Sequence, residues 1–351
     1  MICCAANLQT FGAHTAEFRV WSLGHSLWDC KGVKISLFGG IYKVSIFGGA
    51  FGSYLLFTMT AYTLPEGFAE FDMFAFGSAL LVSGLIGFFL NAVSIGAFLR
   101  VKEMRNPTNF FVFNLAVADI SLNINGLTAA YATYLRYWPF GQDGCSIHAF
   151  QGMISALASI SFMAAIAWDR YHQYCTRQKL FWSTTVTMST IIWVLSIFWA
   201  ALPLAGWGVY DFEPMGTCCT LDYARGDRDY ITYVLTLTLL YLMFPAITMY
   251  SCYNSIYKHF KKIHYHRFNT SLPLRVLFMC WGPYVLMCIY SCFENVKIIS
   301  PKLRMILPIV AKTNPIFNSL FYAFGNEFYR GGLWNFLTGQ KIVEPVIKKS
   351  K

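Results

Sequence analysis

The stretch Ile309-Val310-Ala311-Lys312-Thr313-Asn314-Pro315 places a lysine well inside an apolar segment at residues 303–324. Fourteen residues separate Lys312 from Asn326, about 21 Å of helix at 1.5 Å per residue. A lysine at the membrane centre costs at least about 2.5–3.5 kcal/mol on insertion scales, so it is a candidate functional residue. Its neutral amine is the nucleophile that condenses with an aldehyde. The alternative is a structural lysine satisfied by a buried carboxylate.

Seven apolar segments of spanning length lie along the chain, each close to the ~20 residues that cross a ~30 Å hydrocarbon core. Apolar residues make up 56% of the 351 residues and charged residues 13%, against roughly 45–50% and about 25% in soluble globular proteins. A soluble fold is therefore not expected. We predict an all-α membrane protein, a seven-transmembrane helix bundle, with spans at roughly 72–99, 108–134, 146–170, 183–207, 229–256, 274–294 and 303–324.

The charges of the connecting segments alternate along the chain. Lys and Arg number 27 against 17 Asp and Glu, a net charge of +10. The connections at 100–105, 177–179 and 258–267 are basic, as is the C-terminal tail, whereas acidic residues gather in the alternate connections. Because short basic loops stay in the cytoplasm, we predict an N-terminus outside or in the lumen and a C-terminus inside. Topology thus accounts for the positive charge, and nucleic-acid binding is not expected.

The two ends of the chain differ from the segments between them. Residues 1–58 show no sustained helical period, and their apolar run, Ser45–Met59, is too short to span. We expect this extension to be non-native or disordered, with Met59 as the working start; a cleaved leader is the alternative. Residues 59–325 are expected to form the membrane domain. Residues 326–351 are expected to form a short amphipathic helix and a basic cytoplasmic tail.

Three motifs in these segments are typical of one receptor family. Asp169-Arg170-Tyr171 closes the third segment, Cys280-Trp281-Gly282-Pro283-Tyr284 bends the sixth, and Asn318-Ser319-Leu320-Phe321-Tyr322 ends the seventh. With these motifs the chain resembles the rhodopsin-like G protein-coupled receptors. Lys312, six residues before Asn318, narrows the resemblance to the opsins.

The second outer connection narrows the resemblance further. Its stretches Phe198–Pro203, Gly206–Pro214 and Cys218–Tyr223 resemble the retinal G protein-coupled receptor (RGR) opsins, which are retinochrome-like photoisomerases. The resemblance extends over about residues 60–340. It implies that Lys312 holds all-trans-retinal through a covalent Schiff base.

The same resemblance implies the surroundings of the chromophore. Cys145 and Cys219 are expected to form a disulfide, leaving Cys218 as an unpaired neighbour. Glu213 falls where opsins have a loop carboxylate, and His148 where vertebrate visual opsins have a glutamate counterion. Since histidine is never negative, Glu213 is the expected main counterion and His148 a group that tunes the Schiff base. A solvated loop acid and a neutral helix-end histidine are the alternatives. The residues expected to wall the chromophore are Trp281 and Tyr284, with Tyr241 and Phe244 near its ring.

Further residues resemble the switch through which such receptors activate a G protein. They are Asp169, Arg170, Tyr171, Asn318 and Tyr322. However, no Asp or Glu lies between Lys258 and Trp281, and Ser319 replaces a proline of the family motif. Both departures argue against efficient switching.

Two functions follow from the resemblance. The first is a photoisomerase that converts all-trans-retinal to 11-cis-retinal and supports regeneration of the visual chromophore. The second is a light-activated receptor that signals through a heterotrimeric G protein. A transporter or amine receptor is not expected, since neither requires Lys312. The expected partners are retinal, membrane lipid and a retinoid dehydrogenase or retinoid-binding protein.

The C-terminus suggests where the protein works. The chain ends Lys348-Lys349-Ser350-Lys351, which resembles the dilysine retrieval signal of early secretory membranes. We therefore predict endoplasmic reticulum membranes, in retinal pigment epithelium or Müller glia. The alternative is a basic tail held near anionic lipid.

Overall fold

The computed structural model describes residues 33–38, 41–46, 56–59, 64–224, 226–262, 272–325 and 327–340. The chain divides into two units, residues 1–63 and 64–351. In the first unit, β1 (Val33–Phe38), β2 (Ile41–Ile46) and β3 (Leu56–Met59) form an antiparallel sheet in the order β1-β2-β3. Most of residues 1–58 lie outside the described ranges, so their assignment as a non-native or disordered extension stays a prediction.

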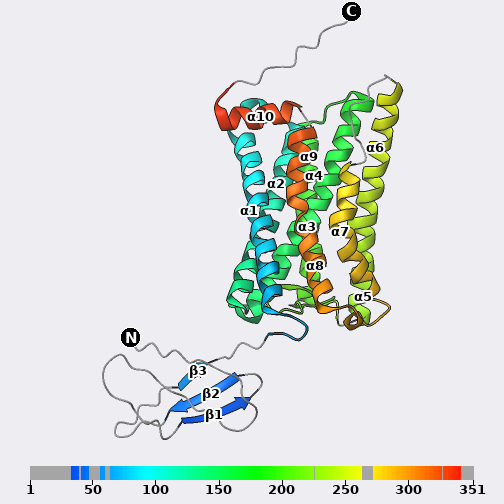
Figure 1. The fold of residues 1–351 in the computed structure, drawn as a ribbon. Helices are drawn as coiled ribbons and strands as arrows, with labels where there is room; N and C mark the ends of the chain where they lie inside the picture. Colours follow the sequence, from blue (N-terminus) through cyan, green and yellow to red (C-terminus); the bar gives the residue numbers. More distant parts are fainter. Residues whose placement is uncertain are drawn as a thin grey trace, which may run out of the picture. The chain divides into compact units, whose positions relative to one another are not determined.

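The second unit is a bundle of long helices (Figure 1). The predicted all-α seven-helix membrane fold is confirmed. Six helical stretches among the described residues are long and apolar enough to cross a membrane. The helices are α1 (Glu70–Arg100), α2 (Pro107–Leu135), α3 (Gly141–Tyr171), α4 (Trp182–Ala201), α5 (Arg228–Thr238), α6 (Phe244–Lys262), α7 (Leu272–Tyr290), α8 (Pro301–Ala311), α9 (Asn314–Gly325) and α10 (Glu327–Thr338).

The seventh predicted segment consists of two helices, α8 and α9, that follow one another end to end (Figure 1). Pro315 lacks the N–H that a continuous helix would donate to the carbonyl of Ala311, and its ring crowds that turn. The chain therefore opens at Lys312 and Thr313. The Thr313 hydroxyl donates to the Val310 carbonyl at 2.7 Å and satisfies part of the broken turn. Lys312 thus lies at an interruption rather than within a regular helix.

The fifth predicted segment is also irregular. A π-turn, Leu239–Met243, joins α5 to α6. Because a π-turn adds a residue to the helical repeat, it rotates the side chains that follow it relative to those before it. In this segment Tyr241, within the π-turn, is buried in the bundle, whereas Phe244, directly after it, is exposed.

Helix ends follow from local sequence. Asn106 accepts a hydrogen bond from the N–H of Asn109 at 2.9 Å, and Pro107 begins α2. Asp227 accepts one from the N–H of Tyr230 at 2.9 Å at the start of α5. An N-cap acceptor followed by a favourable first turn stabilises a helix by about 1 kcal/mol.

The outward faces of the bundle are apolar. Phe71 at 76% exposure and Phe89 at 63% exemplify large hydrophobic side chains that face away from the protein on α1. In a soluble protein such surfaces would drive association. Here they match a lipid environment. A helix can face lipid because its backbone N–H and C=O groups are hydrogen-bonded to one another within the helix.

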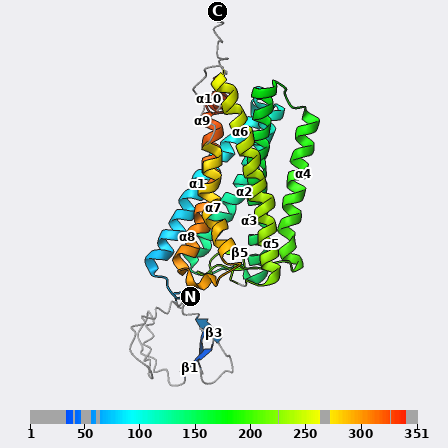
Figure 2. The same ribbon diagram turned by 90° about the vertical axis from the view of Figure 1, so that its right-hand side faces the viewer.

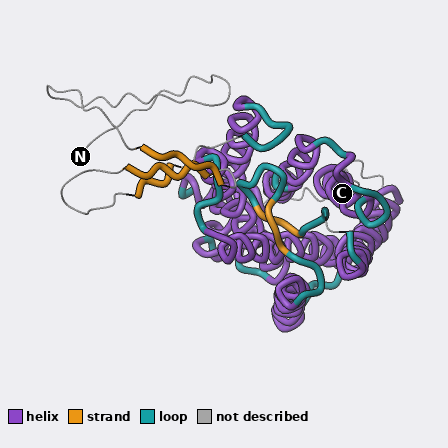
Figure 3. The backbone as a smooth tube through the Cα atoms, turned by 90° about the horizontal axis from the view of Figure 1, so that it is seen from below, coloured by secondary structure: helices purple, strands orange, loops and turns teal. Residues whose placement is uncertain are grey.

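A hairpin of β4 (Tyr210–Phe212) and β5 (Cys219–Leu221) lies across one end of the bundle, within the outline of the helices seen in Figure 3. A disulfide between Cys145 of α3 and Cys219 confirms the predicted bridge and ties the hairpin to the bundle. The short helix α10 lies at the opposite end (Figures 1 and 2). The hairpin therefore closes the end where Lys312, His148 and Glu213 are found.

Candidate functional site

Lys312 points from the break between α8 and α9 towards the hairpin. Its Nζ donates a hydrogen bond to the Sγ of Cys218 at 3.3 Å. Neither Asp nor Glu forms a salt bridge with Lys312 in the part of the chain that the structure describes. The buried carboxylate ion pair considered as a structural role for this lysine is thus not found there.

Cys218 and Cys219 are adjacent but face different surroundings. Cys219 is bonded to Cys145 and belongs to the apolar cluster at the outer end of the bundle. Cys218 packs instead against Leu80 and Ala129. Successive side chains of an extended chain alternate between its two faces, which explains why one sulfur meets α3 and the other meets Lys312.

His148 lies on α3 and is buried, with 7% exposure. Its Nε2 is 3.5 Å from the Sγ of Cys218. On the other side of the ring, the Nδ2 of Asn125 lies 3.3 Å from Nδ1. The ring also packs edge-on against Trp138, with centroids 4.8 Å apart. His148 is therefore held between α2 and the hairpin.

Glu213 lies in the turn after β4 and is 4% exposed, so it is a buried acid rather than a solvated one. Among the described residues, no hydrogen-bond partner is found for its Oε1 atom. Burial, and then the neighbouring Cys218, raise the pKa of the Glu213 carboxyl to about 8, while Lys312 and His148 act in the opposite direction. The solvated-acid alternative is excluded, and Glu213 lies within electrostatic reach of Lys312.

Three of the four aromatic residues expected around the chromophore face the interior of the bundle or contact the hairpin. Trp281 is buried at 7% exposure, and its indole N–H has no partner in the described ranges. The Tyr284 hydroxyl lies 2.9 Å from the hydroxyl of Thr220 in β5. Tyr241, in the π-turn, is buried. The structure does not bring Phe244 into this group, because its side chain is 68% exposed after the π-turn.

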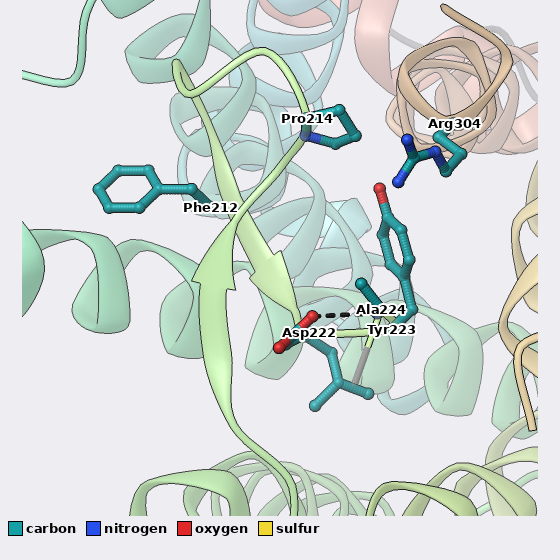
Figure 4. A pocket seen from close by; sticks show the side chains of 7 residues that line it. Phe212, Pro214, Asp222, Tyr223, Ala224 and Arg304 are labelled. Atoms are coloured by element: carbon teal, nitrogen blue, oxygen red, sulfur yellow. Dashed lines mark hydrogen bonds between the residues drawn. The ribbon is translucent and has the colours of Figure 1, made fainter. Parts of the chain in front are cut away.

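A small pocket of about 90 Å³ opens beside the hairpin (Figure 4). In Figure 4 the hydroxyl of Tyr223 points towards the guanidinium of Arg304. Burial, and then the Glu213 charge, raise the pKa of Tyr223. Lys312 is not among the residues that line the pocket. The pocket is therefore lined by Phe212 and Pro214, the chain neighbours of Glu213, and not by the lysine.

The residues compared with a G protein switch lie at the opposite end of α3 and along α9. The Asp169 carboxylate accepts hydrogen bonds from Gln173 at 2.9 Å and from Thr108 at 3.4 Å. Arg170 is buried and Tyr171 packs against the central core. The side chain of Tyr322 lies outside the described residues.

Asn318 belongs to a buried polar network. Its Nδ2 donates to the Oδ2 of Asp119 at 3.0 Å, and the hydroxyl of Ser159 donates to Oδ1 of the same carboxyl at 2.7 Å. The network joins α9 to α2 and α3. It gives both oxygens of the buried Asp119 carboxyl a hydrogen-bond donor, as a packing role requires.

Sequence reasoning did not assign roles to Cys218, Asn125 or Thr220. Asn125 also donates to Gln151 at 2.8 Å, so the histidine belongs to a wider polar group. The alternation of a strand beside the Cys219 disulfide was a signal that Cys218 faces the interior. No local pattern pointed to Asn125, because its contact with α3 depends on tertiary packing.

Comparison with known proteins places this geometry in context. A family model for the 7 transmembrane receptor (rhodopsin family) matches residues 90–322. The RPE-retinal G protein-coupled receptor of Homo sapiens is 44% identical over 79% of this chain and 96% of that protein. The visual pigment-like receptor peropsin of Homo sapiens is 28% identical over 72% and 80%. The crystal structure of squid rhodopsin has the same fold, with a TM-score of 0.70 at 22% identity over 80% and 90%.

Proposed function

Since the chain belongs to the rhodopsin family of seven-transmembrane receptors, and within it to the RGR opsins, we propose that it binds all-trans-retinal through Lys312. We propose further that light converts this retinal to the 11-cis form, which is then released for regeneration of visual chromophore. The observation that supports the proposal most strongly is the position of Lys312. It lies at a helix break, beside a buried acid and under a disulfide-bridged hairpin.

The residues around Lys312 fit an aldehyde joined to a long apolar chain. The Lys312 amine supplies the nucleophile, and condensation forms one C=N bond while the aldehyde oxygen leaves as water. Trp281, Tyr284 and Tyr241 provide aromatic surface. Two buried polar atoms, Oε1 of Glu213 and the indole nitrogen of Trp281, have no partner within the described ranges and are available to a ligand.

The protein's part in the reaction is to hold and shield the ligand. Retinal, when bound, supplies the light absorption and the double bond that isomerises. Glu213 provides the negative charge that a protonated nitrogen at Lys312 requires in a medium of low dielectric constant. His148 stays close enough to tune that nitrogen through Cys218. The hairpin, tied to α3 by the disulfide, limits access of water.

A second candidate function is light-dependent signalling through a heterotrimeric G protein. The Asp169-Arg170-Tyr171 sequence at the inner end of α3 favours it. Ser319, in place of the family's proline, argues against efficient switching. Light-dependent nucleotide exchange on purified G proteins tests this function, and exchange equal to that of the dark sample excludes it for the G proteins used.

The cellular setting forms part of the same proposal. We infer that the protein works in endoplasmic reticulum membranes of retinal pigment epithelium or Müller glia, where a retinoid dehydrogenase or retinoid-binding protein exchanges retinal with it. The dilysine-like terminus supports this location. Residues 341–351 lie outside the described part of the chain.

Attachment at Lys312 can be tested by chemical trapping. Full-length protein in membranes is incubated with all-trans-retinal, treated with borohydride, and analysed by peptide mass spectrometry. We expect a reduced retinyl group on Lys312. Lys312→Arg keeps the positive charge but cannot form the C=N bond, so it should not be labelled.

Lys297→Arg, an exchange at an exposed outer lysine, serves as the matched control and should be labelled like the parent. Equal labelling of the Lys312→Arg protein would overturn the attachment site.

A further inference from the structure

The pocket beside the hairpin contains two polar groups without a partner (Figure 4). The hydroxyl of Tyr223 and the Nε of Arg304 are both shielded from solvent, and within the described ranges neither atom has a hydrogen-bond partner. Tyr223 is only 4% exposed, and its hydroxyl points towards the Arg304 guanidinium in Figure 4. A buried donor without an acceptor is unfavourable. The pair therefore indicates a site for a ligand that accepts hydrogen bonds.

Arg304 also carries a positive charge that needs a counter-ion. None of the salt bridges found among the described residues includes it. Asp222 lines the same pocket, but its Oδ1 accepts a hydrogen bond from the backbone N–H of Ala224 at 3.0 Å. In Figure 4 this carboxylate lies at the end of the pocket away from the guanidinium. The charge of Arg304 is thus available to an anion from solution.

The Tyr223 hydroxyl keeps its hydrogen at neutral pH and acts as a donor. Burial, and then the charge of Glu213, raise its pKa, while Arg304 acts in the opposite direction. A hydrogen bond from the guanidinium to this oxygen would still leave the hydroxyl hydrogen and the positive charge without an acceptor. The ligand that satisfies both groups must accept hydrogen bonds and carry negative charge.

The size and charge of the pocket restrict this ligand to a small monovalent ion. The volume of about 90 Å³ corresponds to roughly three water molecules at about 30 Å³ each. One guanidinium balances one negative charge, and the Asp222 carboxylate disfavours an ion that carries more. We propose that the pocket binds a chloride ion between Arg304 and Tyr223.

Chloride in this position connects the hairpin to the helix that leads to Lys312. Tyr223 follows β5, and Arg304 lies near the start of α8, eight residues before Lys312. The disulfide at Cys219 ties the same hairpin to α3. The ion therefore provides a second attachment of the hairpin to the bundle. This binding site goes beyond the proposed function and does not depend on retinal.

Chloride binding is tested by thermal unfolding of the retinal-free, full-length protein in membranes. Sodium chloride is exchanged for sodium gluconate at constant ionic strength, because gluconate is too large for the pocket. A ligand that binds only the folded state raises the unfolding temperature. We expect a rise of about 2–4 °C at a chloride concentration several times Kd. Equal unfolding temperatures in the two salts would overturn the site.

Three variants assign the effect to this pocket. Arg304→Gln removes the charge, and Tyr223→Phe removes one donor but keeps the ring, so both should lose the chloride-dependent shift. Arg228→Gln, at an exposed arginine at the start of α5, is the matched control and should keep it. A shift of parent size in either pocket variant would overturn the inference, and if one variant does not fold, the other decides. Because retinal is left out, this result is independent of the trapping experiment at Lys312.

Discussion

The backbone N–H of Glu213 donates to the carbonyl of Cys218 at 2.9 Å. One tight turn thus holds both the carboxyl expected to be the counterion and the thiol that contacts Lys312. The disulfide at Cys219 fixes the same turn to α3. Motion of the turn would therefore displace both groups from the lysine together.

Replacing the Glu213 carboxyl should weaken the protonated Schiff base. In Glu213→Gln we expect its pKa to fall and the absorption to move towards the ultraviolet, because an uncompensated buried charge is unfavourable. His148→Ala should shift this pKa less. Absorption spectra recorded across a pH series measure both variants. A Glu213→Gln pigment that titrates like the parent would assign the counterion role to another group, such as Glu294 or a bound anion.

The same carboxyl should make the retinal-free protein less stable as the pH rises. Its folded pKa, about 8, lies above the ordinary value of 4.5, so between these values the folded state binds more protons than the unfolded state. The stabilising contribution is fully present below about pH 4.5 and is lost as the pH approaches 8. Thermal unfolding of parent and Glu213→Gln protein should therefore diverge over this interval. Parallel curves would contradict the buried state of Glu213.

Loss of the disulfide should destabilise the protein and open the hairpin. Cys219→Ser removes a bridge across 74 residues, and loss of a native disulfide commonly costs about 2–5 kcal/mol. We expect a lower unfolding temperature and faster bleaching of the pigment by hydroxylamine. Cys252→Ser, which leaves the bridge intact, is the control. Equal bleaching of both variants would argue against the hairpin as a lid.

The terminal lysines should retain the protein inside the cell. Replacing Lys348 and Lys349 with Ser should increase the fraction at the cell surface, measured by surface biotinylation. The same two residues replaced with Arg preserve the charge and separate retrieval from attraction to anionic lipid. A distribution unchanged by the Ser exchange would leave only the basic-tail interpretation.

Hydrophobic segment length was enough to predict the bundle and the position of Lys312 inside the seventh segment, because both depend on composition and local patterns that the sequence displays directly. The disulfide was implied by the resemblance to the RGR opsins. Pro315 also signalled the break between α8 and α9, although the segment was predicted as one span. The break follows from the missing N–H of proline.

Other parts of the site depend on tertiary packing. Phe244 was expected near the chromophore, but the π-turn before it leaves it largely exposed. Cys218 contacts Lys312 across 94 residues, and Asn125 meets His148 only because α2 and α3 pack together. The spacing of hydrophobic residues within one segment gives no information on contacts between different segments.

We expect light to convert retinal bound at Lys312 from the all-trans to the 11-cis form. The most direct measurement is extraction of retinal isomers from full-length protein in membranes, before and after illumination, with Lys312→Arg membranes as the reference. We predict all-trans-retinal in the dark and predominantly 11-cis-retinal after light in the parent only. An isomer mixture identical to that from the Lys312→Arg membranes would contradict photoisomerisation of retinal at Lys312.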